Sequence, residues 1–475
     1  MRIRILRVSA AILAAAAAFP AAAQQERLES RYRTPPPYAD PAFPATPVPP
    51  PDKSYLIPFG EVLFLNTAIW SWNYAAGKEF AKISWHSIQQ NFDKGWIVDT
   101  DDFWANQLMH PIHGNLSYNT ARSTGLGFYE SFGYAFFGSF LWEQLAEIQP
   151  PSLNDQVMTP AGGSLVGEAL FRMYRLILDS GGYAPSGSRQ FFGLLVNPVA
   201  GGNRLLFKDR FRGSLLLPPS WMGEFRLGGL VSGSNRNRAL SVKEVDIGTW
   251  FAIGTDIVYG IPGTPGLELE NPFDHFTLAA SLSFNGDMAE HPTATLQVRG
   301  LLLGETVCFG DGDPDGLWGL FTSYDFIAPA VFRVAGFGVG PGMSLRKRWD
   351  WFDLYGTLVA EALPWAGGGS TVALGVRDYH YGPGGSLALE FRGHLSDRAI
   401  VRLSGREYWL SGSYAQGEAE DISYAQAALT FRVYGMHGIT TALDWSARRA
   451  RRPLRADVLQ HAANFTLYYT ILRGW

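Results

Sequence analysis

From Leu205 to the end of the chain, apolar and polar residues alternate with a period of two. Side chains of a β-strand point alternately to its two faces, so each such segment has one apolar and one polar face. The segments number roughly a dozen and are about ten residues long, the length that a tilted strand needs to cross a bilayer. The pattern therefore predicts that residues 205–475 form an outer-membrane β-barrel of about 12 antiparallel strands. The clearest apolar faces are Phe276, Leu278, Ala280, Leu282 and Phe284; Leu387, Leu389, Phe391 and Leu395; Ala425, Ala427, Leu429, Phe431 and Val433; and Ile439, Leu443 and Trp445.

The last residues of the chain also indicate a barrel. One face of the final extended segment carries Phe465, Leu467, Tyr469, Ile471 and Trp475. This ending resembles the C-terminal signal of bacterial outer-membrane barrels, with Arg473 as a departure that an interfacial, snorkelling arginine tolerates. We expect the last strand to pair with the first strand, near Leu205, and the protein to lie in the cell outer membrane.

Glycine-rich clusters at residues 367–370 and 382–385 are predicted to be turns between strands. A soluble β-sandwich would show the same alternation. The terminal aromatic residue, the export signal below and the confinement of Glu390, Arg392 and Arg432 to one face together favour the barrel.

The first residues have the anatomy of a secretory signal peptide, predicted over residues 1–23. Arg2, Arg4 and Arg7 precede an apolar run, and small residues stand before Gln24. Residues 24–54 are rich in proline and are predicted to be a semi-rigid linker.

The net charge of −4 gives no support to a nucleic-acid partner. Cys308 is the only cysteine, which excludes an intrachain disulfide, and we expect its thiol to be buried and inert.

Residues 55–204 are predicted to form a helical domain, so the whole chain is an α+β protein. Apolar-rich stretches at Val62–Tyr74, Phe128–Ile148 and Leu165–Leu178 exceed the length of a typical strand. None is predicted to span a membrane, because polar residues interrupt the first and the uncharged part of the second is too short. We expect this domain on the periplasmic side or inside the barrel lumen.

The helical region also contains the densest set of polar and glycine motifs, which resembles a family of bacterial envelope proteins catalogued as domain of unknown function 3943. The resemblance implies an envelope setting and no established activity. Its motifs are His110-Pro111 with Gly114, Trp142-Glu143, Pro151-Ser152 with Asn154-Asp155, Gly162-Gly163 and Gly167-Glu168.

Five residues of this region are candidates for metal binding or acid–base catalysis by residue type: His110, His113, Glu143, Glu147 and Asp155. Their spacing matches no known motif, and Pro111 argues against a regular helix around the histidines.

A structural role is the main alternative. Glu143, Glu168, Arg122 and Arg172 are predicted to form a buried ion-pair network between helices.

The helix after Pro150-Pro151 is expected to begin near Thr159-Pro160, capped by Asn154-Asp155. Gly162, Gly163 and Gly167 then allow close helix packing.

Two charged segments lie in the barrel region. The acidic run Asp311–Gly316 lacks the final glutamate of a calcium loop and is predicted to be a solvated turn. The basic run of Arg448, Arg449, Arg451, Arg452 and Arg455 is predicted to join the last two strands, where it is either solvated or in contact with lipopolysaccharide phosphates.

The sequence supports three functional hypotheses. The first is an outer-membrane barrel with a structural or transport-related role. The second is an envelope hydrolase that acts on lipid or glycan through His110, His113, Glu143 and Asp155. The third is an adaptor that binds a periplasmic protein through the aromatic segment Tyr55–Trp85. Expected partners are outer-membrane lipid, the barrel-assembly machinery and a periplasmic protein; no cofactor and no nucleic acid are expected.

Overall fold

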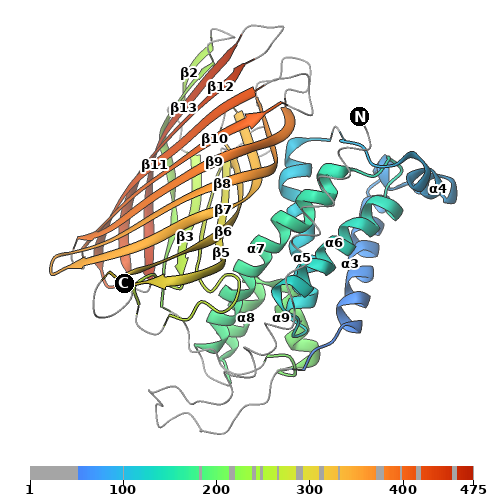
Figure 1. The fold of residues 1–475 in the computed structure, drawn as a ribbon, viewed down its shortest axis with the longest axis horizontal. Coiled ribbons are helices and arrows are strands. Elements are labelled where there is room, and N and C mark those ends of the chain that lie inside the picture. The colour runs from blue at the N-terminus through green and yellow to red at the C-terminus, as the bar shows by residue number, and fades with distance from the viewer. Residues whose placement is uncertain are drawn as a thin grey trace.

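The computed structural model describes residues 52–475 except for residue 100, the short stretches 181–183, 213–219, 238–241, 247–249, 265–266, 285–292, 310–314, 330–331, 371–378, 396–397, 413–418 and 452–456, and the last two residues. The predicted signal peptide, most of the proline-rich linker and Trp475 lie outside this part of the chain. Figure 1 shows a group of helices standing beside a large barrel.

The helical domain confirms the three predicted apolar helices. Its elements are α3 (Leu56–Ala75), η1 (Glu79–Ala81), α4 (Trp85–Lys94), the π-helical turn η2 (Ala105–Met109), α5 (His110–Arg122), α6 (Phe128–Leu145), α7 (Leu153–Asp179), α8 (Gly187–Val196) and α9 (Pro198–Phe207). Within the described residues, no helix combines the length and apolarity that crossing a membrane requires.

The strands form one antiparallel sheet that closes on itself through β1 and β13. They are β1 (Trp221–Asn237), β2 (Val242–Asp246), β3 (Trp250–Tyr259), β4 (Phe276–Phe284), β5 (Thr293–Val307), β6 (Gly316–Ala328), β7 (Phe332–Trp349), β8 (Phe352–Ser370), β9 (Tyr379–Leu395), β10 (Ala399–Ser411), β11 (Ala419–Tyr434), β12 (His437–Arg451) and β13 (Val458–Arg473). β2 and β3 pair with successive parts of β1 and share one position in the wall. The sheet is therefore a closed barrel of 12 wall positions, as predicted.

The pairing of first and last strands is confirmed, but it begins further along the chain than expected. Gly223 of β1 faces Arg473 of β13, whereas Leu205 belongs to helix α9. The two glycine clusters predicted as turns are also strand residues, in β8 and β9. There glycine makes room for neighbours: a Cβ on Gly368 would lie 2.5 Å from a carboxylate oxygen of Glu420.

The alternation separates the two faces of the barrel wall. On β9 to β13 and β1, the outward side chains are apolar and largely exposed, and we call this surface the bare wall. Its residues are Phe225, Leu227, Leu387, Leu389, Phe391, Leu403, Trp409, Phe431, Ile439, Leu443, Trp445, Phe465, Leu467 and Tyr469. The inward positions of the same strands carry polar and charged side chains such as Glu390, Arg402 and Arg448.

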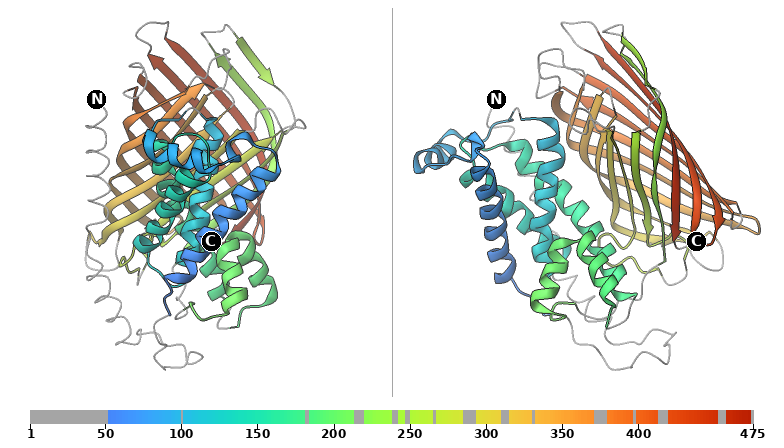
Figure 2. Two further views of the ribbon diagram at one scale, coloured as in Figure 1. Left: turned by 90° about the vertical axis from the view of Figure 1, so that its right-hand side faces the viewer. Right: turned by 180° about the vertical axis from the view of Figure 1, so that it is seen from behind.

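On the other side of the barrel, the outward face is buried beneath the helical domain, and we call it the covered wall. Its residues are Ile257, Tyr259, Phe276, Leu278, Ala294, Val298, Tyr324, Phe326, Ala335, Trp365 and Tyr381, from strands β3 to β9. They pack with Phe103, Tyr118, Met158 and other helical residues in one apolar cluster. Figure 2 shows the helices alongside the barrel rather than within it. The expectation of lumen-filling helices is therefore wrong, because these helices bind the outward face of the wall.

Candidate functional site

Two glycines bring helices α5 and α7 into backbone contact. A Cβ on Gly114 would lie 1.9 Å from the carbonyl oxygen of Thr159, and one on Gly163 would lie 2.5 Å from the carbonyl carbon of Gly114. Gly114 lies one helical turn after His110, and Gly163 lies one turn after Thr159. The contact therefore places His110 beside the first turns of α7.

Three of the five sequence candidates meet at this point. The ligand atoms of His110, Glu143 and Asp155 all lie within 4.8 Å of one another. His110 Nε2 is 3.8 Å from Asp155 Oδ2, and its Nδ1 is 3.2 Å from the hydroxyl of Thr159. Glu143 and Asp155 are almost fully buried, with 1% and 2% exposed, and His110 is partly buried.

Further polar residues join this cluster to the barrel. Asn154 Nδ2 donates to Asp99 Oδ1 and to Asp155 Oδ1, at 3.0 and 3.1 Å. Asn106 donates to the same oxygen of Asp99 and to the hydroxyl of Tyr381 on strand β9, at 2.6 and 3.2 Å. The cluster thus lies directly behind the covered wall. Asp99, Asn106 and Tyr381 carry no motif that sequence reasoning could have used.

Burial sets the protonation of the cluster. It raises the pKa of Glu143 and of Asp155 well above the usual value, and the neighbouring carboxylates Glu147 and Glu143, respectively, add to each shift. Burial also lowers the pKa of His110 to about 4, although the charge of Asp99 opposes this. Burial therefore acts in the same sense on all three groups, favouring their uncharged forms.

The other two candidates, His113 and Glu147, have hydrogen-bond partners outside this cluster. His113 Nε2 is 2.7 Å from the side-chain oxygen of Asn66, and its ring meets Trp142 edge to face. Glu147 accepts a hydrogen bond of 2.6 Å from the indole of the same Trp142. Burial lowers the pKa of His113 to about 3 and raises that of Glu147 to about 7. Both residues position helices α5 and α6 rather than joining the three-residue cluster.

The predicted ion-pair network is present, with one exception. Glu168 pairs with Arg122 at 2.7 Å and with Arg172 at 2.8 Å, while Arg172 reaches Asp274 at 2.9 Å. Glu143 is not part of it, because its Oε2 accepts from the backbone N–H of Ser152 at 2.8 Å. Burial of Glu168 is outweighed by the two guanidinium groups, which lower its pKa. Since Asp274 follows strand β3, the network also ties the helices to the barrel.

Two helix starts differ from the sequence interpretation. α5 begins at His110 with Pro111 in its first turn, where proline is tolerated because its missing N–H needs no partner. α7 begins at Leu153, with Ser152 as its cap, and Pro160 lies inside the helix. Asp155 is therefore a first-turn residue of α7 and faces the cluster.

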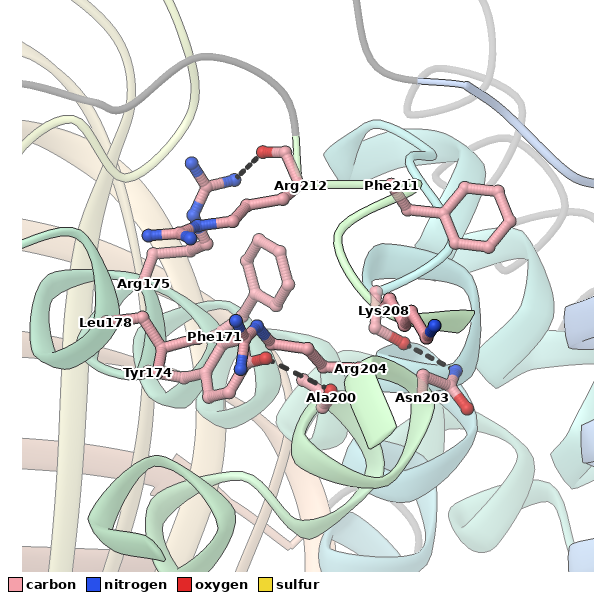
Figure 3. Close-up of a pocket in the computed structure, with 11 residues that line it drawn as sticks. Phe171, Tyr174, Arg175, Leu178, Ala200, Asn203, Arg204, Lys208, Phe211 and Arg212 are labelled. Carbon is pink, nitrogen blue, oxygen red and sulfur yellow. Dashed lines mark hydrogen bonds between the residues drawn. The ribbon is translucent and has the colours of Figure 1, made fainter. Parts of the chain in front are cut away.

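The helical domain also contains a small cavity beside the ion pairs, shown in Figure 3. It lies between α7 and α9, and Tyr174 donates a hydrogen bond of 3.2 Å across it to the carbonyl of Ala200. Its volume of about 30 Å³ fits a water molecule, not a lipid or a sugar.

The lumen contains ion pairs that cross it. Asp256 of β3 pairs with Arg392 of β9 and Arg402 of β10. Glu361 of β8 lies 3.4 Å from Arg299 of β5.

The charged runs and the cysteine of the barrel region differ from their predictions or lie outside the described residues. Arg448 lies inside the lumen on β12 and pairs with Glu420, so it is not a loop residue. Cys308 is exposed rather than buried, because it follows the end of strand β5. Most of the acidic run 311–316 and of the basic run after Arg451 lies outside the described residues.

Comparison with solved structures finds outer-membrane proteins. OmpTdeltaL8, a loop L8 deletion mutant of OmpT from Vibrio cholerae, is 10% identical with a TM-score of 0.20, covering 53% of this chain and 98% of that chain. An outer membrane channel from Pseudomonas putida F1 is 10% identical with a TM-score of 0.27, covering 54% and 97%. The toluene transporter TodX of Pseudomonas putida is 8% identical with a TM-score of 0.22, covering 58% and 94%.

No curated protein matches the chain. One family model does, and its match spans α5, α6 and α7 together with the three-residue cluster. Residues 95–199 match the domain of unknown function DUF3943, which confirms the resemblance carried by the motifs of the helical region.

Proposed function

We propose that this protein is a closed outer-membrane barrel whose role is structural: it anchors the helical domain at the membrane and does not conduct solutes. The observation that carries the proposal is the pairing of Asp256 with Arg392 across the lumen.

These two residues stand on opposite sides of the barrel. Between β3 and β9 lie β4 to β8 in one direction, and β1 with β13 to β10 in the other. An ion pair between strands at opposite positions blocks the centre of the lumen. Arg402 binds the second oxygen of the same carboxylate, so Asp256 is held by two guanidinium groups.

Other inward side chains also contact one another in the lumen. Glu361 accepts hydrogen bonds from Ser323 at 2.9 Å and Ser386 at 3.2 Å, which connects β6, β8 and β9. An apolar cluster joins inward residues of six strands: Ile327, Phe332, Val334, Leu363, Ala366, Tyr408, Leu410, Ile422, Tyr424 and Ala462. Barrels of this size lie between filled eight-stranded barrels and open porins, so packed side chains suffice to close one.

The membrane setting follows from the bare wall. Exposed Leu, Phe and Trp side chains over several adjacent strands form a continuous apolar surface of the kind that marks a membrane or protein interface. Lipid is the environment that suits such a wall. We infer that the cell outer membrane is the location, in agreement with the fold.

Conductance across planar bilayers tests the proposal. The full-length protein should give no stable open channel, with an open porin as the positive control in the same membranes. The Asp256→Ala variant removes the central pair and should raise the frequency of channel events, whereas Asp457→Ala, at an exposed site, should not. Steady conductance or solute flux through the unmodified protein would overturn the closed-barrel proposal.

The alternative of an envelope hydrolase has one supporting observation, the convergence of His110, Glu143 and Asp155. Both carboxylates are buried, so a lipid or glycan reaches them only if α5, α6 and α7 separate. Hydrolysis of envelope lipids or glycans by the purified protein, lost in His110→Gln, would favour this alternative.

A further inference from the structure

We propose that His110, Glu143 and Asp155 bind a divalent transition-metal ion of the Zn²⁺ class, held between α5, α6 and α7 behind the covered wall. The site would be structural, since it joins three helices at the place where they meet the barrel.

The ligand set suits such an ion. One imidazole nitrogen and two carboxylate oxygens lie within 4.8 Å of one another, and each is a ligand type that Zn²⁺ accepts. Ligand atoms around tetrahedral zinc lie about 3.4 Å apart, so side-chain shifts of about an ångström bring them into range. The imidazole nitrogen favours a transition metal over Mg²⁺ or Ca²⁺, which prefer oxygen ligands.

Three carboxyl groups lie together at this site. Asn154 donates to a carboxylate oxygen of Asp99 and to one of Asp155, so a third carboxyl group lies beside the two proposed ligands. Among the described residues, no lysine or arginine pairs with any of these three carboxyl groups, although Glu143 and Asp155 are buried. Buried carboxylates are retained as charged groups only when they are paired or bind a metal.

One oxygen of the cluster also lacks a partner. Glu143 Oε2 accepts from the backbone of Ser152, but within the described residues nothing hydrogen-bonds to Oε1. Leaving a buried carboxyl oxygen unsatisfied is costly, and a metal ion would supply the missing contact.

Neighbouring residues orient the ligands as in a metal site. Thr159 Oγ1 lies 3.2 Å from Nδ1 of His110, which leaves Nε2 toward Asp155. With Nδ1 protonated and donating to the hydroxyl, Nε2 carries the lone pair that a metal needs. Asn154 similarly fixes Asp155 through its Oδ1.

Metal titration of the chelator-treated, full-length protein in detergent tests the proposal. Zn²⁺ should bind with one-to-one stoichiometry and raise the melting temperature, and Co²⁺ in its place should give the visible absorption of a nitrogen–oxygen ligand set. His110→Gln and Glu143→Gln should lose stoichiometric binding. Thr159→Val should weaken binding by about 10- to 100-fold, because it removes only an orienting contact.

Glu147→Gln is the matched control, since Glu147 is a half-buried glutamate one turn from Glu143 that bonds to Trp142 instead. It should bind Zn²⁺ as the unmodified protein does. Equal loss in Glu147→Gln, or no stoichiometric binding by the unmodified protein, would overturn the proposal. The Co²⁺ spectrum decides the question even if the ligand variants fail to fold.

Discussion

The hydroxyl of Tyr324, on the outward face of strand β6, donates a hydrogen bond to the backbone carbonyl of Gln107 in the helical domain. Gln107 lies in the π-helical turn η2, just before Pro111, which has no N–H to offer to a helix carbonyl. The barrel wall thus supplies a hydrogen-bond donor at the point where the backbone departs from the α-helical pattern. The same π-helical turn that contains Gln107 leads directly into His110, so barrel docking and cluster geometry are linked.

Replacing Tyr324 with phenylalanine should loosen this docking. The ring remains, but the buried Gln107 carbonyl loses its donor, which should cost about 1 kcal/mol in the free energy of unfolding. Thermal unfolding and the rate of proteolysis within residues 95–199 measure the effect. Tyr434→Phe is the control, because Tyr434 is 81% exposed. Equal stability of the two variants would contradict the role given to this hydroxyl.

Gly114→Ala should be strongly destabilising, since the added Cβ meets the backbone of Thr159 and not a movable side chain. We expect a loss of about 1–3 kcal/mol or more, as for overpacking. Gly133→Ala offers a comparison in α6, where a Cβ has nothing within 4 Å. That variant should be neutral or more stable, because alanine favours helix by about 1 kcal/mol over glycine. Chemical denaturation followed by tryptophan fluorescence distinguishes the two.

Glu168→Gln should destabilise the helical domain by roughly 3–5 kcal/mol, because it leaves two buried guanidinium groups without their shared carboxylate. The pKa of Glu168 lies below its usual value of 4.5 in the folded protein. Its stabilisation is therefore complete above that pH and is lost as the pH falls through the lower, folded value.

Melting temperatures measured from pH 7 to pH 3 test this dependence. The unmodified protein should lose stability toward acid more steeply than Glu168→Gln. The exposed Glu79→Gln should behave as the unmodified protein does. Parallel acid profiles for all three proteins would argue against a charged Glu168.

Lipid-attached quenchers can locate the helical domain relative to the bilayer. In a Cys308→Ser background, a fluorophore at position 443 on the bare wall should be quenched. We expect quenching at position 64 of α3 too, because Leu56, Phe64 and Trp72 are exposed apolar residues of a domain that lies alongside the wall. Quenching at 443 alone would place the helices outside the bilayer and support the periplasmic location predicted from sequence.

The period-two pattern predicted the barrel well because each strand must separate its faces. It could not reveal the covered wall. Ile257 and Leu278 beneath the helices are as apolar as Leu389 and Leu443 on the bare wall, so protein contact and lipid contact produce the same residue types. The prediction of turns at the two glycine clusters was wrong for a related reason. Glycine is common in turns, but within a β-strand it also lets neighbouring groups approach the backbone closely.

The candidate site was predicted in part. Residue type identified His110, Glu143 and Asp155, yet it identified His113 and Glu147 equally well. What separates them is the backbone contact of Gly114 with Thr159, a distance between two helices that no local spacing encodes. Glu168 and Arg172 were predictable as a pair because opposite charges four residues apart share a helical face. Arg122 was added by charge alone, since it lies on α5 and not on α7.

The hydrogen bonds that close the barrel, between β1 and β13, run through the bare wall, whereas the helices pack mainly on the covered wall. The helices precede every strand in the chain, so they are synthesised before there is a wall to cover. Helices docked on β3 to β9 leave the two terminal strands, β1 and β13, uncovered. Pairing of β1 with β13 can therefore complete the barrel without dissociation of the helices from the covered wall.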